Sequence, residues 1–198
     1  MSIAGLDDIA AKVIEGHALT DADAEALAST YDIVSLGMVA DDARKTRHAT
    51  RTTFLRVAHV PATPAPDQQA SSPRSARELR VDAPFVDIEE ASAAVRVFAP
   101  IPRHPGGEPT TGYEDVKAVA LARILLADVP HIQADWTLHG PKLAQVALTF
   151  GADDMDNVSP LDEVAEGRRR APLEEIRRNI RAAGFEAIER DPRFSFVG

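Results

Sequence analysis

The chain has 198 residues, a formal net charge of −9 and no cysteine. This length is sufficient for one hydrophobic core, and 44% apolar with 27% charged residues is the composition of an ordinary globular protein. The negative charge disfavours binding to nucleic acid or to an anionic membrane surface. No apolar run approaches the roughly 20 residues of a membrane span, and the first eight residues lack the basic and apolar regions of a signal peptide. We therefore expect a cytoplasmic protein, in which an absence of disulfides is usual.

The first 60 residues are expected to form three helices followed by a strand. Asp7 is suited to cap a first helix that ends near Gly16, and Thr20 is suited to cap a second helix with an acidic first turn. A third helix presents one face formed by Ile33, Leu36, Gly37 and Ala40. Residues 52–60 are rich in β-branched and aromatic side chains, which predicts a strand that ends at Pro61.

Residues 61–84 differ in composition from the rest of the chain. The segment contains five prolines, and its only large apolar side chains are Leu79 and Val81. Such a segment buries too little apolar surface to offset its conformational entropy. We therefore predict a flexible proline-rich linker at 61–84.

Residues 85–198 alternate between strand and helix patterns. Thr111–Glu114 has the form of a capping box at a helix start. Pro141 and Pro172 suit the first turn of two further helices, which Gly151 and Gly184 are placed to end. The expected strands are Ala93–Ile101, His131–Leu138 and Phe185–Glu189. This alternation is typical of parallel βα units, which close into a barrel or wind into an open sheet.

Three runs in the last third of the chain resemble the aminofutalosine synthase family, radical-SAM enzymes of the futalosine route to menaquinone. The runs are His131–Trp136, Gly140–Leu148 and Phe150–Asp156. Further similar positions are Ala99–Pro102, His104–Pro105, Thr111–Gly112, Asp115–Lys117, Ala183–Gly184 and Glu189–Asp191. Weaker similarity extends to Lys12–Val13, Gly16, Leu36–Gly37, Ala40 and the strand that ends in His59.

The resemblance implies an α/β fold, a partial (half) TIM-like βα barrel with N-terminal helices. We expect residues 1–60 to hold those helices and the first strand. The linker at 61–84 would then separate them from a βα half-barrel at 85–198, which resembles the C-terminal part of aminofutalosine synthase.

The chain departs from the family at the cofactor. The resemblance implies three cysteines in the pattern C-x-x-x-C-x-x-C after the first strand, followed by about half of the barrel, and residues 61–84 stand in that place. An open [4Fe–4S] cluster needs three thiolates, which proline, serine and glutamine cannot supply. We therefore predict no cofactor and no metal, and exclude reductive cleavage of S-adenosylmethionine by this chain alone.

A half-barrel would leave its inner face and two strand edges open to water. Burial of about 500 Å² of apolar surface is worth on the order of 12 kcal/mol, so association is favoured. We predict a homodimer or a complex with a protein that completes the barrel. The alternative is that the linker or the N-terminal helices cover the open side.

Candidate ligand-binding residues are those expected at the carboxyl ends of strands, where barrel enzymes place their sites. They are His104, Trp136, His139, Asp153, Asp154 and Asp156. They suit a small polar or aromatic ligand. Each also has a structural interpretation: tryptophan fills cores, and aspartates at strand ends hydrogen-bond turn amides more often than they bind Mg²⁺ or Ca²⁺.

Three functions fit these observations. The first is a non-catalytic partner or scaffold, linked to menaquinone biosynthesis through an intact radical-SAM enzyme or another protein of that route. The second is a small-molecule binding protein that uses the retained half-pocket. The third is an enzyme of another type, in which His104 or His131 acts with Asp154 as an acid–base pair.

Overall fold

The computed structural model describes residues 3–56, 78–81, 96–100, 110–191 and 193–197. The candidate ligand residue His104, the end of the predicted first strand and most of the predicted linker lie outside these ranges. No helix within them combines the length and the apolar character that crossing a bilayer requires.

Three helices precede the sheet: α1 (Ile3–Glu15), α2 (Asp21–Ser29) and α3 (Ile33–His48). The predicted helix start at Thr20 is confirmed, and the structure adds a capping box: the Thr20 side chain accepts a hydrogen bond from the Asp23 amide, and the Asp23 carboxylate accepts one from the Thr20 amide. The predicted start at Asp7 is wrong, because α1 already begins at Ile3. Gly16 follows the end of α1 with a φ of +74°.

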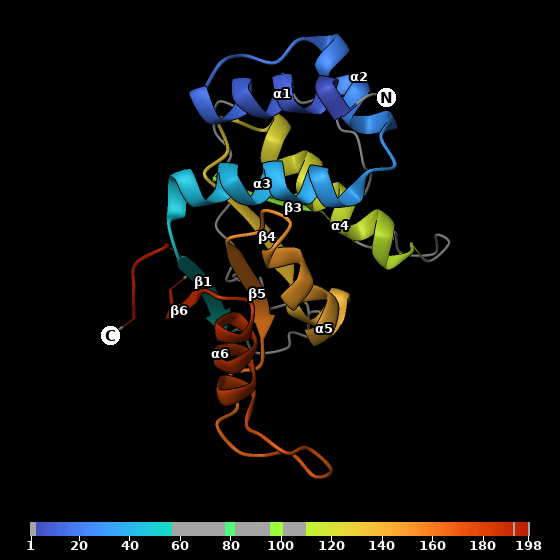
Figure 1. The fold of residues 1–198 in the computed structure, drawn as a ribbon. Helices are drawn as coiled ribbons and strands as arrows, with labels where there is room; N and C mark the ends of the chain where they lie inside the picture. Colours follow the sequence, from blue (N-terminus) through green and yellow to red (C-terminus); the bar gives the residue numbers. More distant parts are fainter. Residues whose placement is uncertain (1–2, 57–77, 82–95, 101–109, 192, 198) are drawn as a thin grey trace, which may run out of the picture.

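These helices share a core with α4 (Gly112–Leu125). Figure 1 shows α1 and α2 at one end of the molecule, with α3 between α1 and the sheet. The core is formed by Leu6, Ile9, Leu27, Leu36, Val39, Ala40, Ala120, Leu121 and Ile124. The Thr111–Glu114 capping box is confirmed at the start of α4.

A six-stranded parallel sheet carries the rest of the fold, which confirms the α/β class. Its strands are β1 (Arg51–Arg56), β2 (Glu78–Val81), β3 (Val97–Pro100), β4 (His131–Asp135), β5 (Asp154–Val158) and β6 (Glu186–Glu189). The order across the sheet is β2-β3-β4-β5-β1-β6. The helices α5 (Trp136–Leu148) and α6 (Pro172–Ala182) follow β4 and β5 and pack on one face of the sheet over the second core, which includes Phe54, Ala134 and Met155.

The last strand occupies the side of β1 that faces away from β5. Thr52 and Thr53 are in register with Ala187 and Ile188 of β6. Beyond β6 the chain turns back, and the Val197 amide donates to the Glu189 carbonyl at 2.8 Å. Our expectation of two open sheet edges is therefore wrong at the end of β6, where residues 195–197 cover part of the edge.

Other predicted boundaries also differ from the structure. The strand predicted to reach Leu138 ends at Asp135, because the Asp135 carboxylate accepts hydrogen bonds from the Thr137 and Leu138 amides and so caps α5. α5 contains a kink at Gly140, whose φ is +74°, directly before Pro141. Glu78–Val81, inside the segment predicted to be linker, forms β2 beside β3.

The predicted glycine ends of two helices are confirmed. Gly184 has a φ of +89° directly after the C-cap of α6, and the Phe185 amide donates to the Ile180 carbonyl as a Schellman motif requires. Gly151 has a φ of +104°, and the following Ala152 amide reaches back to the Ala147 carbonyl of α5.

Candidate functional site

The five predicted site residues that the structure describes lie at opposite ends of the sheet. Asp154 is the first residue of β5 and Asp153 precedes it, so both lie at the amino ends of the parallel strands. Trp136, His139 and Asp156 lie toward the carboxyl ends of β4 and β5. The expectation that all of these residues meet at the carboxyl ends is therefore wrong for the two aspartates that open β5.

Asp153 is the centre of a buried ionic network at the amino ends. Its carboxylate pairs with Arg123, accepts the Ile132 amide at 2.8 Å and lies 2.6 Å from Nδ1 of His131. Nε2 of His48 is 3.4 Å away. Burial alone would raise the pKa of Asp153, but the Arg123 charge and the His131 hydrogen bond outweigh it and hold that pKa well below its usual range.

His48, His131 and Asp153 also have the composition of a metal site. One ligand atom from each lies within 4.8 Å of the others. The carboxylate, however, already accepts hydrogen bonds on both oxygens, and the buried Arg123 guanidinium neutralises its charge. A divalent cation would have to displace these contacts beside a fixed positive charge, so the group fits a structural ion-pair network better than a metal centre.

Asp154 belongs to a second buried network. The Arg190 guanidinium binds it through two nitrogens, Thr53 Oγ1 lies 2.6 Å from Oδ1, and the Gln133 amide donates to Oδ2 at 2.7 Å. Of the two acid–base pairs that the third function allowed, the one with His104 lies outside the described residues. The pair of His131 with Asp154 is not assembled, because His131 contacts Asp153 and Asp154 is saturated by Arg190 and its neighbours.

A small hollow lies at the carboxyl ends of β4 and β5. Its volume is about 290 Å³, and Trp136, Thr137, Asn157, Ser159 and Glu175 are among the residues that line it. The Asn157 side chain donates to the Asp135 carboxylate, and the Asp156 carboxylate accepts the Asn157 amide. The hollow thus combines an aromatic wall with fixed polar groups, the usual composition of a small-molecule site. Trp136 is also mostly buried in the sheet core.

His139 lies beside this end of the sheet with one ring nitrogen unused. Since a carbonyl oxygen only accepts, Nδ1 of His139 must carry the proton that it donates to the Asp135 carbonyl at 3.0 Å. Nε2 is then a buried lone pair without a partner among the described residues. Burial lowers the pKa of His139, so its neutral form is favoured.

Asp115 is a buried carboxyl group that the sequence reasoning missed. It lies in the first turn of α4, and its Oδ1 lacks a hydrogen-bond donor within the described part of the chain. Burial raises the pKa of Asp115, and a hydrogen bond from Thr110 opposes this rise. An acid in a first helical turn is normally solvated and favoured by the dipole, so the sequence alone gave no signal of its burial.

The side chains do not fit the cofactor that the resemblance implies. An iron–sulfur cluster requires cysteine thiolates, and the 198 residues contain none. The donors at both ends of the sheet are carboxylates, imidazoles and amides. No step through such a cluster can be derived from this chain.

Comparison with known proteins indicates the same radical-SAM relatives as the sequence motifs. Residues 105–197 match the family described as the CofH/MqnC C-terminal region. An aminodeoxyfutalosine synthase of Streptomyces coelicolor is 38% identical over 78 residues, which are 39% of this chain and 19% of that protein. A 5-amino-6-(D-ribitylamino)uracil–L-tyrosine 4-hydroxyphenyl transferase of Methanosarcina acetivorans is 32% identical over 116 residues, 51% of this chain and 31% of that protein.

The matched stretches therefore span less than a third of these relatives' length. Among solved structures, methylornithine synthase aligns with a TM-score of 0.61 at 12% identity, covering 90% of this chain and 97% of the other. At this identity the alignment concerns the fold alone, and it supports the prediction of a TIM-like α/β architecture.

Proposed function

Because residues 105–197 match the family of the CofH/MqnC C-terminal region, we propose that the chain is a non-catalytic relative of these radical-SAM enzymes that acts by associating with another protein. Its similarity to enzymes of the futalosine route suggests that its partner takes part in menaquinone biosynthesis. The observation that carries this proposal is the combination of an intact C-terminal core with the absence of any cysteine.

An exposed apolar surface supports association. Val34 and Met38 lie one turn apart on α3 and are about two-thirds exposed, and Tyr31, just before the helix, is 89% exposed. Tyr113 of α4 adjoins them through a hydrogen bond from its hydroxyl to the Tyr31 carbonyl. We call these four residues the α3 surface. Large apolar side chains gathered on one face are typical of interaction sites.

Analytical ultracentrifugation of the full chain at micromolar concentration tests this proposal, alone and mixed with the Streptomyces coelicolor aminodeoxyfutalosine synthase. We expect self-association or a mixed complex, weakened at least ten-fold by Val34→Asp with Met38→Asp. The matched control is Ile14→Asp with Val146→Asp, two exposed apolar residues on other helices, which should change affinity less than two-fold. A 21.3 kDa monomer in both samples contradicts the proposal.

The second candidate function is small-molecule binding at the hollow of about 290 Å³. It is favoured by Trp136 and the polar groups around it at the carboxyl ends of the strands. We expect an aromatic acid or a futalosine-like nucleoside to raise the thermal midpoint of the wild type, and Asn157→Ala to abolish this rise. An equal rise in the variant, or none in the wild type, excludes this candidate.

A further inference from the structure

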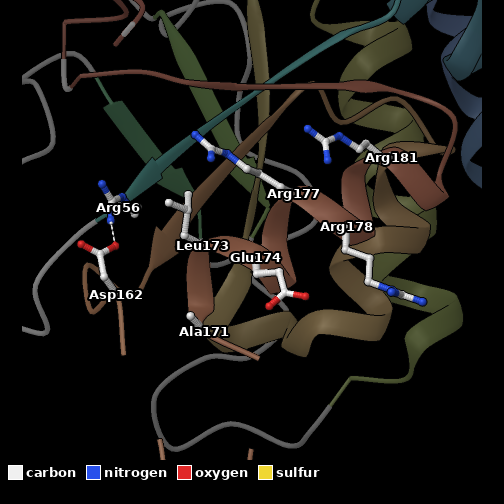
Figure 2. A pocket seen from close by; sticks show the side chains of 8 residues that line it. All are labelled: Arg56, Asp162, Ala171, Leu173, Glu174, Arg177, Arg178 and Arg181. Carbon is white, nitrogen blue, oxygen red and sulfur yellow. Dashed lines mark hydrogen bonds and ion pairs between the residues drawn. The ribbon is translucent and has the colours of Figure 1, made fainter. Parts of the chain in front are cut away.

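A second, larger hollow lies between α6 and the carboxyl end of β1. Its volume is about 790 Å³. It is lined by Arg56, Asp162, Ala171, Leu173, Glu174, Arg177, Arg178 and Arg181 (Figure 2). Four of these eight residues are arginines and two are acids, and even with Glu189, which pairs with Arg56, the arginines outnumber the acids, whereas the whole chain carries −9. A local charge opposite to that of the chain concentrates anions at this place.

The α6 arginines repel one another. Arg177 and Arg181 are four residues apart, and Figure 2 shows their side chains extending in the same direction while Arg178 points elsewhere. Like charges at this spacing destabilise a helix. Arg177 has one long contact with Glu189, at 3.8 Å, and Arg181 has no ion pair with any described residue. Their charges are therefore largely uncompensated within the described structure.

Arg56 is held in place at the other side of the hollow. Its Nε donates to Glu189 Oε1 and its Nη1 to Asp162 Oδ1, both at 2.7 Å. Nη2 makes no hydrogen bond with any described residue, so within this part of the chain it can still donate one. A guanidinium fixed by two carboxylates loses little side-chain entropy when it binds an anion.

The geometry points to this hollow as a binding site for a small organic molecule with at least two anionic groups, phosphate or carboxylate, held by Arg56, Arg177 and Arg181. Leu173 supplies an apolar contact for the body of the molecule. The volume lies within the range of small-molecule pockets. The inference is independent of the proposed association, since the α3 surface and this hollow share no residue.

Isothermal titration of the full chain with pyrophosphate and with citrate, at matched ionic strength, tests the site and separates the two sources of anionic charge. We expect at least one probe to bind saturably with a stoichiometry near one. Arg177→Gln with Arg181→Gln should weaken that binding about ten-fold or more, since each guanidinium contributes a charge-assisted hydrogen bond.

Arg168→Gln with Arg169→Gln is the matched control, because it removes the same charge from residues that do not line this hollow. It should change affinity less than two-fold. The α6 variant should keep or exceed the thermal midpoint of the wild type, since the substitutions remove a repulsive pair. The proposal is overturned if neither probe binds saturably, or if both double variants lose affinity equally.

Discussion

Arg190 and Asp154 form a fully buried, bidentate ion pair across β1. Nε of Arg190 lies 2.6 Å from Oδ1 of Asp154, and Nη2 lies 2.5 Å from Oδ2. The pair joins the residue after β6 to the first residue of β5, and β1 lies between these strands. It therefore fixes the C-terminal strand to the sheet.

Asp154→Asn should destabilise the protein by about 3–5 kcal/mol, because it leaves the Arg190 charge buried without its counter-charge. The free energy of unfolding from urea denaturation measures the effect. Asp162→Asn is the control, since Asp162 is 75% exposed in its ion pair with Arg56, and it should cost less than about 1 kcal/mol. Equal losses of unfolding free energy in the two variants would show that the buried ion pair stabilises the fold no more than the exposed one.

The Asp153 network predicts acid sensitivity. The pKa of the Asp153 carboxyl group is held below the ordinary value of 3.8. The network therefore stabilises the fold fully above about pH 4 and progressively less as the pH falls further. The free energy of unfolding of the wild type should therefore decline below about pH 4. Asp153→Asn should be less stable than the wild type at neutral pH, and its free energy of unfolding should decline less between pH 4 and lower pH. An identical decline in both proteins would show that Asp153 is not its source.

His48 predicts a second, separate dependence on pH. Burial lowers its pKa below 6.5, so the unfolded chain binds a proton in a range where the folded chain does not. Stability must then fall as the pH decreases from about 6.5 toward the lower folded value. Urea denaturation between pH 7.5 and 5 should show a shallower slope for His48→Gln than for the wild type. A steeper or unchanged slope contradicts the prediction.

Gly37 is required by the packing of α3 against Phe150. A Cβ atom at this position would lie 2.7 Å from Cε1 of the Phe150 ring. Gly37→Ala should therefore cost about 1–3 kcal/mol through forced displacement of the ring. At Gly112, in α4, an added Cβ would meet Leu143 at an ordinary 3.4 Å, so Gly112→Ala should be neutral or stabilising by up to about 1 kcal/mol. Thermal or urea unfolding of the pair distinguishes the two sites.

Local rules within the sequence predicted most helix ends, and short motifs indicated the family that the C-terminal half resembles. The capping boxes at Thr20 and Thr111 and the glycine end at Gly184 follow from hydrogen bonds within a few residues, which neighbouring residues specify directly. The resemblance to a radical-SAM family rests on short runs such as His131–Trp136. The absence of cysteine is likewise read directly from the sequence, and it excludes thiolate ligands for a cluster.

Only the tertiary structure decided where the charged residues lie. No strand was predicted between Gly151 and Pro172, and only the structure shows that β5 begins at Asp154, which puts Asp153 and Asp154 at the amino end of the sheet. The Arg190 partner of Asp154 lies 36 residues away, and the position of β6 beside β1 joins strands far apart in the chain. Such long-range pairings depend on which surfaces the whole fold buries, so a local sequence pattern cannot predict them.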